Sequence, residues 1–590
     1  MFKKLFLPGF LILLGVVLFM NPTMKEIAAG VAILLFGMIM LEEGFNSFVA
    51  GPLQNLLEKA TNKLYKSLGL GFIVTALLQS SSLISVITIS FISAGLIGLN
   101  AGIGIIFGAN IGTTATAWLV SIFGLKIKVS SLAMPMLAFG IILVMQKSKM
   151  IKGVGNVLAG LGFFFLGIYF MKNGFDVYKE NIDLAAYAMP GFAGLMVYTL
   201  IGIAITLVLQ SSSAAMALIL TALAVNQITY TNSLALAIGA NIGTTITAII
   251  GSLSANIAGK RLAGAHLLFN LVTGLIALVF VGYLGQFVDF VSENTGIADD
   301  NYTIKLSIFH TVFNLIGVIV MVPLINPMVK LLHKVFKEKP EEDLIDYPKY
   351  LDESSMAYPQ SAIRALLNET KRLFEKATFK IVSHGMNIRR TDLKSEEKIK
   401  KVVKKSREEI DVDIEEMYLQ KVKTIYSKII KYATLSQSQF SLSPEATRAF
   451  AQIKLANRNI VEAIKALHAI RDNVNDYLVS DNEYIQKEYD KLRQKVSKIL
   501  RELYLLKHAK NPKKHKSTLA KLKAKAEKSD ILLDGSFDKL IRENKITSEM
   551  AASLANDSHD VALLSKKLIT AAELIYIQSD TLLNLVEDDD

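Results

Sequence analysis

The sequence contains no cysteine, and its 590 residues include only 12 prolines and one tryptophan. The absence of cysteine excludes disulfide bonds and thiolate metal sites. Charge is also scarce, but only in one part of the chain. Residues 1–340 hold 20 Lys/Arg and 12 Asp/Glu, whereas the remaining residues hold 44 and 40. The first part therefore has the composition of a protein in lipid, and the second that of a protein in water.

Long hydrophobic runs occupy the charge-poor part. Residues 67–125 and 184–259 contain no charged side chain. Because about 20 apolar residues cross a bilayer, each run holds more than one pass. Residues 1–20 resemble a signal peptide but lack a small-residue cleavage site, so we expect a retained transmembrane helix. Further apolar segments are predicted at 27–41, 68–95, 100–123, 129–146, 153–171, 193–225, 229–252, 263–285 and 304–328.

Basic loops predict the orientation, because Lys and Arg gather on the cytoplasmic side. The residues expected there are Lys3, Lys4, Lys147, Lys149, Lys152, Lys260, Arg261, Lys330, Lys334, Lys337 and Lys339. The acidic loop 286–303 suits the outside, as does a loop near 172–192. Three apolar stretches join the inner end of helix 27–41 to Lys147, so one of them must enter the membrane and return. The same parity holds between the loop near 172–192 and Lys260, while Lys126 and Lys128 fall outside as a mild violation.

Three motifs occur twice at an almost constant offset. "LFGMIMLEEGF" at 35–45 matches "FLGIYFMKNGF" at 165–175, and "TALLQSSS" at 75–82 matches "TLVLQSSS" at 206–213. "GANIGTTATA" at 108–117 matches "GANIGTTITA" at 239–248. The crossing count makes the two copies inverted, with repeat 1 at about 25–125 and repeat 2 at about 153–252. Inverted repeats with segments that do not cross are typical of secondary transporters, whose site lies between the copies.

The polar residues inside these apolar segments suggest binding chemistry. A hairpin that turns within the membrane exposes N–H and C=O groups at its tip, where they must line a cavity or pack on protein. "QSSS" lies near such a tip, and "GANIGTT" is expected to break its neighbouring helix. Such groups can form an anion cradle or an oxygen cage for a small cation. A lone anion is costly in a site almost without charge, so a co-bound cation would offset that cost.

The paired motifs resemble those of the type II sodium/phosphate cotransporter family over roughly residues 25–330. The resemblance implies an all-α polytopic membrane domain, residues 1–335, with helices 263–328 after the repeats, inorganic phosphate as substrate and sodium as coupling ion. The residues it implies for phosphate are Gln79, Ser80, Ser81, Ser82, Gln210, Ser211, Ser212 and Ser213. Those implied for sodium or for lining the site are Asn110, Thr113, Thr114, Asn241, Thr244 and Thr245. "HLLFN" and "HTVFN" offer supporting residues, namely His266, Asn270, His310 and Asn314.

Simpler structural roles compete with several of these functional ones. Serine triplets commonly pack transmembrane helices together, although two copies with the same partner motif disfavour that explanation here. His266 and His310 could each bond only a neighbouring helix, and Trp118 is expected to anchor at the membrane interface. Glu42 and Glu43 are expected to mark a cytoplasmic helix end, because Lys172 and Asn173 replace them in the second copy. The alternative is a role in proton coupling.

The charged part, residues 345–585, has the pattern of amphipathic helices in a bundle. Ile460, Ile464, Leu467, Ile470 and Val474 form one apolar stripe, and similar stripes are predicted near 356–385, 395–432, 485–507 and 536–585. The order of segments resembles a PhoU-type domain of paired three-helix bundles, expected in the cytoplasm. The acidic group is either a solvated helix face or a metal-binding one, and consists of Glu408, Glu409, Asp411, Asp413, Glu415 and Glu416. The acidic tail 587–590 is expected to be disordered.

The sequence therefore predicts a sodium-coupled phosphate transporter of the plasma membrane with a cytoplasmic regulatory domain, and not an enzyme. The alternatives are a signalling scaffold, a transporter of another oxyanion or dicarboxylate, and a serine enzyme with His266 or His310 as base. The last lacks a carboxylate in the uncharged runs to orient the base. No cofactor is expected besides sodium, no basic block points to nucleic acid, and a homodimer is left open.

Overall fold

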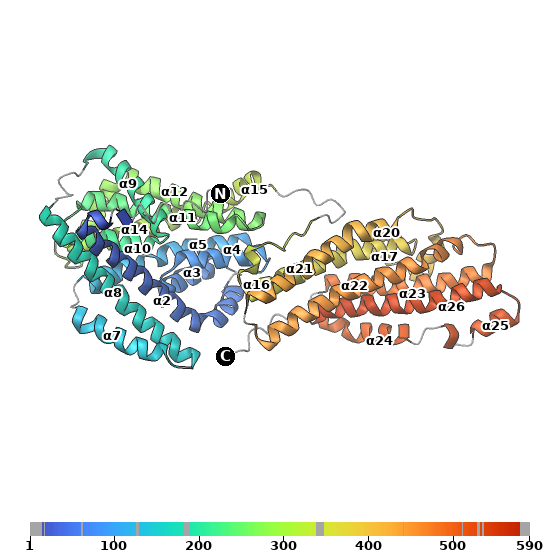
Figure 1. The fold of residues 1–590 in the computed structure, drawn as a ribbon. Helices are drawn as coiled ribbons and strands as arrows, with labels where there is room; N and C mark the ends of the chain where they lie inside the picture. The colour runs from blue at the N-terminus through green and yellow to red at the C-terminus, as the bar shows by residue number, and fades with distance from the viewer. Residues whose placement is uncertain are drawn as a thin grey trace. The chain divides into compact units, whose positions relative to one another are not determined.

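The computed structural model describes residues 15–16, 18–60, 63–125, 129–181, 189–337, 347–440, 442–509, 511–527, 531–533 and 536–578. These residues form helices and no strand, which confirms the all-α prediction. The chain divides into two compact units, Met1–Glu338 and Lys339–Asp590, coloured blue to green and yellow to red in Figure 1. The predicted helix 1–20 lies almost wholly outside the described residues, as do Lys126, Lys128 and the acidic tail.

Seven helical stretches in the first unit are long and apolar enough to cross a membrane, which confirms a polytopic membrane protein. They are Met24–Phe45, Leu99–Gly124, Lys149–Val177, Gly191–Leu209, Tyr230–Ser252, Ile257–Val279 and Tyr302–Met321. Helix α7 (Val129–Val144) packs against α8 (Lys149–Asn181) and is one of the shorter apolar helices.

Two helices continue well past the apolar segments predicted for them. α2 spans Pro22–Ala60 rather than 27–41, and α8 reaches Asn181 rather than ending near 171. The predicted loop near 172–192 therefore begins as helix. The end of the α2 extension, residues 53–60, is rich in Leu, Glu, Lys and Ala, which favour helix whether or not lipid surrounds them. The α8 extension contains the helix formers Lys172, Lys179 and Glu180. Apolar content thus locates the apolar segment of a helix but does not predict where the helix ends.

α2 and α8 pack in an antiparallel pair along a seam of glycines. A Cβ atom added at Gly30 would lie 2.5 Å from the backbone nitrogen of Met171, and one at Gly37 would lie 2.5 Å from that of Phe164. At Gly44 the nearest backbone nitrogen is that of Val157, at 2.7 Å. Contacts on α8 move backward as those on α2 move forward, and the α2 glycines are seven residues apart. Only glycine lets the two backbones approach this closely.

Two helical hairpins carry the repeated "QSSS" segments. α3 (Leu64–Leu78) and α4 (Ser81–Ser93) meet at Gln79 and Ser80, and α9 (Gly191–Leu209) and α10 (Ser212–Ala224) meet at Gln210 and Ser211. Residues 70–74 and 84–88 line one small cavity, so the arms of the first hairpin lie side by side. Helices of 15 and 13 residues are about 22 and 20 Å long. They fall short of a bilayer core of about 30 Å, consistent with a hairpin that returns.

Each hairpin packs against the helix that carries the "GANIGTT" motif. An added Cβ at Gly108 of α5 (Leu99–Gly112) would lie 1.9 Å from the Leu68 carbonyl oxygen. The matching Cβ at Gly239 of α11 (Tyr230–Ser252) would lie 2.0 Å from the Thr199 carbonyl oxygen. Both members of the pair are shifted by 131 residues, so the repeat extends to packing. The predicted break occurs in the first copy, where α6 (Thr114–Leu119) follows α5. It is wrong for the second copy, where α11 runs unbroken through the motif, so the two glycines do not by themselves end a helix.

The predicted segments 263–285 and 304–328 each divide in two. The four helices are α12 (Ile257–Val279), α13 (Val281–Asn294), α14 (Tyr302–Met321) and α15 (Ile325–Val335). Pro323 lies in the turn between α14 and α15 and cannot donate the hydrogen bond that would continue α14. The whole first half of the predicted acidic loop, residues 286–294, belongs to helix α13. Asp289 of α13 forms a 2.8 Å ion pair with the buried Lys305.

The second unit is built from long helices, some interrupted by a π-helical turn. Its elements are η3 (Ser354–Ala357), α16 (Pro359–Arg372), η4 (Leu373–Thr378), α17 (Phe379–Gly385), α18 (Arg390–Lys394), α19 (Ile399–Lys405), α20 (Ile414–Met417), η5 (Tyr418–Lys423), α21 (Thr424–Gln439), α22 (Pro444–Asp476), α23 (Glu483–His508), η6 (Pro512–His515), α24 (Lys516–Glu527), η7 (Ile531–Leu533), α25 (Ser536–Arg542), α26 (Ser548–Ala572) and η8 (Glu573–Ile577). The stripe predicted on α22, from Ile460 to Val474, is buried.

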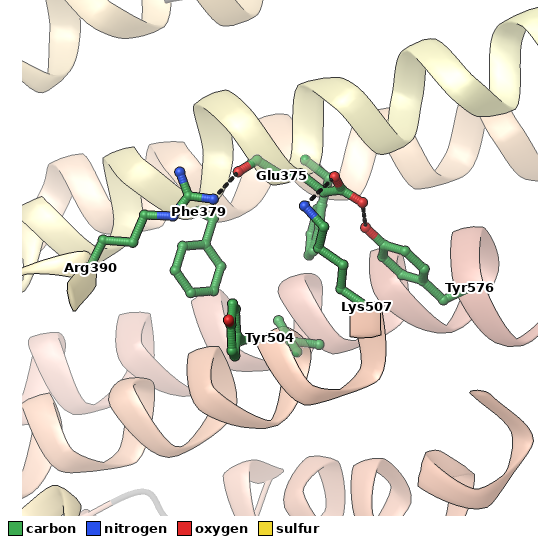
Figure 2. A pocket seen from close by; sticks show the side chains of 8 residues that line it. Glu375, Phe379, Arg390, Tyr504, Lys507 and Tyr576 are labelled. Atoms are coloured by element: carbon green, nitrogen blue, oxygen red, sulfur yellow. Dashed lines mark hydrogen bonds and ion pairs between the residues drawn. The ribbon is translucent and has the colours of Figure 1, made fainter. Parts of the chain in front are cut away.

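A polar contact ties the first helices of this unit to its last (Figure 2). Glu375 in η4 lies between Lys507 of α23, at 2.7 Å, and the Tyr576 hydroxyl of η8, at 2.5 Å. Burial, with Glu375 beside it, raises the pKa of the Tyr576 phenol far above its ordinary value. The phenol therefore stays protonated and donates to the carboxylate, which holds three segments together.

The acidic group does not form one helix face. Residues 407–413 are not helical, and Asp413 caps α20 by accepting a 2.8 Å hydrogen bond from the Glu416 backbone. Glu409, Asp411 and Asp413 line a shallow groove together with Arg471, whose guanidinium contributes positive charge. No group of three or more His, Asp or Glu side chains suited to a metal ion occurs in the part of the chain that the structure describes.

Candidate functional site at the hairpin tips

Both hairpin tips have the same backbone geometry. Gln79 and Gln210 adopt the left-handed conformation, with φ of 55° and 52°. The serine that follows each glutamine caps the returning helix, since Ser80 accepts a 3.3 Å hydrogen bond from the Leu83 backbone and Ser211 a 3.2 Å bond from that of Ala214. The left-handed residue ends one helix and the serine starts the next, so two residues suffice to connect the helices at each tip.

These caps leave other N–H groups at the starts of α4 and α10. The first backbone N–H groups of a helix have no partner within it and carry the positive end of its dipole. Ser81, Ser82, Ser212 and Ser213 occupy these first positions in the two helices. Each tip therefore presents backbone donors and serine hydroxyls together, an arrangement suited to an anion.

The two copies contact each other through their third serines. Ser82 of the first copy lies 3.2 Å from the Thr247 hydroxyl of the second, and Ser213 of the second lies 3.0 Å from the Thr116 hydroxyl of the first. Thr116 also donates to the Gln79 side-chain oxygen at 2.6 Å. Thr116 and Thr247 are 131 residues apart and so are equivalent in the two copies. The third serine of each copy thus contacts the equivalent threonine of the other copy.

A single cavity of about 440 Å³ collects both tips. All eight residues implied for phosphate line it, namely Gln79, Ser80, Ser81, Ser82, Gln210, Ser211, Ser212 and Ser213. The remaining wall is formed by Leu35, Met38, Ile39 and Glu42 of α2, with Leu83, Val86 and Leu209. Two segments 131 residues apart thus form one site rather than two.

The residues implied for sodium do not line this cavity. All six are buried, namely Asn110, Thr113, Thr114, Asn241, Thr244 and Thr245. Each of the four threonines donates to a backbone carbonyl three residues earlier in its own chain segment. A hydroxyl that donates in this way keeps oxygen lone pairs for another partner.

The histidine motifs contribute to a buried amide cluster. The Asn241 amide donates to the side-chain oxygens of Asn270, at 3.0 Å, and Asn314, at 2.9 Å. The side chains of Asn270 and Asn314 in turn donate to the backbone oxygens of His266 and His310. Neither imidazole lines the cavity that holds the serines. The motifs therefore join α11, α12 and α14.

Three residues of the site were not predicted from the sequence as substrate contacts. Thr116 and Thr247 lie within the paired "GANIGTTATA" and "GANIGTTITA" motifs, so their repetition was a signal. Glu42 lines the cavity, although the sequence indicated a helix end, with proton coupling as the alternative. Trp118, expected at the membrane interface, donates its indole N–H to Thr311 at 2.9 Å.

The comparisons with known proteins agree with this geometry. A family described as Na+/Pi-cotransporter matches residues 33–173 and 193–321, which contain both hairpins and every residue of the cavity. This part of the chain belongs to the Na+/Pi-cotransporter family. No solved structure matches the chain.

Proteins similar to this chain include YjbB of Escherichia coli strain K12, whose name proposes inorganic phosphate export. It is 29% identical over 353 residues, which are 60% of this chain and 63% of the relative. YjbB of Escherichia coli O157:H7 is 26% identical over 77% of this chain and 78% of its own length. YqeW of Bacillus subtilis, named as uncharacterized, is 27% identical over 52% of this chain and 97% of its own length.

Proposed function

We propose that the protein is a sodium-coupled transporter of inorganic phosphate that works by alternating access. The observation that carries the proposal is the single cavity into which both hairpin tips place helix N-termini and serine hydroxyls. Such donors suit a tetrahedral oxyanion, which needs several hydrogen bonds from different directions. The family description and the name of the E. coli relative support the same substrate.

Sodium is proposed to bind beside the anion, through the oxygens of the paired Asn–x–Gly–Thr–Thr segments. Their threonine hydroxyls have acceptor capacity left, as described above, and small hard cations prefer oxygen ligands. A cation there would offset the cost of placing an anion among side chains that are nearly all neutral.

The inverted repeat is proposed as the device for alternating access. It is supported by the antiparallel packing of α2 and α8, which are counterparts at an offset of 130. It is supported again by the packing of α3 on α5, which α9 and α11 reproduce residue for residue. The helical unit 345–585 is proposed as a PhoU-like regulatory domain on the cytoplasmic side.

Uptake of radiolabelled phosphate into proteoliposomes tests the proposal. Vesicles would carry an inward sodium gradient, an outward sodium gradient or potassium alone. We expect saturable phosphate movement that follows the sodium gradient, with potassium a poor replacement. Equal rates in sodium and in potassium would contradict the sodium coupling, and the absence of phosphate movement in every arm would contradict the substrate.

A further inference from the structure

Nearly every polar group on the wall of the cavity can donate a hydrogen bond. The lining contains two glutamine amides, six serine hydroxyls and the backbone amides at two helix starts. Among the described residues that line it, Glu42 has the one ionisable side chain. A carboxylate in a site built from donors is unexpected, because it accepts hydrogen bonds and repels anions.

The structure holds Glu42 in this place. The residues of α2 that line the cavity are Leu35, Met38, Ile39 and Glu42, whose spacing puts them on one helix face. The glycine seam on the opposite face is packed closely against α8, so the helix cannot withdraw from the site. Glu42 is half-buried and interacts with the Ser80 side chain.

Its neighbour provides a comparison within the same helix. Glu43 is exposed and does not line the cavity. The sequence treated the two glutamates alike, as markers of a helix end, whereas the structure separates them. The helix-end prediction is wrong for both, because α2 continues to Ala60. The position of Glu42 on the cavity wall therefore calls for a different explanation.

The chemistry of oxyanions supplies one. Near neutral pH phosphate retains one or two protons, so it can donate a P–O–H hydrogen bond, whereas sulfate is fully deprotonated and can only accept. An ionised carboxylate among donors therefore favours an anion that brings its own proton and repels one that does not. Sites built to bond a substrate hydroxyl reject analogues that lack it by about 10⁴- to 10⁵-fold.

We infer that Glu42 is a specificity-determining residue, which accepts a hydrogen bond from the protonated oxygen of the substrate and so excludes sulfate. This inference rests on the proposed function, since it assigns a role within the same phosphate site. It predicts that arsenate, which is protonated like phosphate, is accepted.

The test is competition for phosphate binding by the purified full-length protein. Labelled phosphate would be displaced by phosphate, arsenate or sulfate in the wild type, Glu42→Gln, Glu42→Asp and Glu43→Gln, at constant pH and sodium. In the wild type and in Glu43→Gln we expect arsenate to compete and sulfate to fail. In Glu42→Gln the new amide can donate, so sulfate should gain at least about 100-fold relative to phosphate. Glu42→Asp keeps the carboxylate and should still reject sulfate.

The outcomes separate this inference from the proposed function. A wild type that binds no phosphate would contradict the proposed function itself. If phosphate binds but Glu42→Gln rejects sulfate as strongly as the wild type does, the inference alone fails. The phosphate titration is then repeated at several sodium concentrations. The inference also fails if Glu42→Gln changes only the sodium dependence of phosphate binding, which would make Glu42 a cation ligand. Should Glu42→Gln not fold, Glu42→Asp decides, since competition by sulfate in that variant contradicts the inference.

Discussion

At the scale of the residue, the paired serines give the sharpest expectation. Ser81→Ala and Ser212→Ala each remove one hydroxyl from the cavity wall. A hydrogen bond to a charged group contributes about 1.5–3 kcal/mol, so each change should weaken phosphate binding roughly 10- to 150-fold. The double variant should depart from additivity, because both hydroxyls serve one ligand. Equilibrium phosphate titration of the purified variants measures both effects.

Matched controls lie on the same two helices. The hydroxyls of Thr88 in α4 and Thr221 in α10 are buried and donate to their own helices, at 2.6 and 2.7 Å. Thr88→Ala and Thr221→Ala should leave the affinity for phosphate unchanged. If a serine variant binds phosphate as tightly as these controls do, that serine packs helices instead of holding substrate.

Residue identity was predictable where the sequence repeated it. The two "QSSS" segments could be placed in one site because their context recurs at a fixed offset. Glu42 could not be assigned to the site from the sequence, because its counterpart in the second copy is Lys172. An acidic residue after an apolar segment also fits the boundary of a membrane helix. Only the packing of α2 beside α3 and α10, which places Glu42 on the cavity wall, reveals that its carboxylate lies with the serines.

At the scale of the element, the stability of the helix packing depends on glycines that let two backbones approach closely. Gly108→Ala would place a Cβ 1.9 Å from the Leu68 carbonyl oxygen, whereas Gly69→Ala meets no atom within 4 Å. Overpacking against backbone typically costs about 1–3 kcal/mol or more. Gly108→Ala should therefore lower the unfolding temperature in detergent, while Gly69→Ala should not. Equal melting of the two variants would mean that α3 and α5 can separate without cost.

The sequence predicted the apolar membrane segments well, but it predicted the ends of helices and the charged segments poorly. Hydropathy and loop charge located the apolar segments and the need for hairpins. It missed the ends of α2 and α8, because helix propensity continues beyond the membrane. The sequence also placed the whole acidic group on one helix face, because charge alone does not distinguish a helix from the non-helical stretch 407–413.

At the scale of the whole molecule, the two units should be separable. Each is compact by itself, and every residue of the cavity belongs to the first. A chain ending near residue 340 should therefore keep its affinity for phosphate while its transport rate or regulation changes. Phosphate titration of the folded truncation, beside the full chain, measures this. A folded truncation that binds no phosphate would place part of the site in the second unit.

The glycine seam between α2 and α8 has a consequence for how the chain encodes its own alignment. The seam repeats every seven residues on both helices, so a slip of seven residues, about 10 Å, again sets glycine against glycine. Gly37 would then face Gly167 instead of Gly160. Close packing along the seam therefore holds the two helices together but does not select one register. A pattern that fits several registers needs another contact that fits only one. The cavity supplies it, because Glu42 of α2 lies beside both hairpin tips in a single register. The contacts in the cavity therefore fix the register that the glycine seam leaves open.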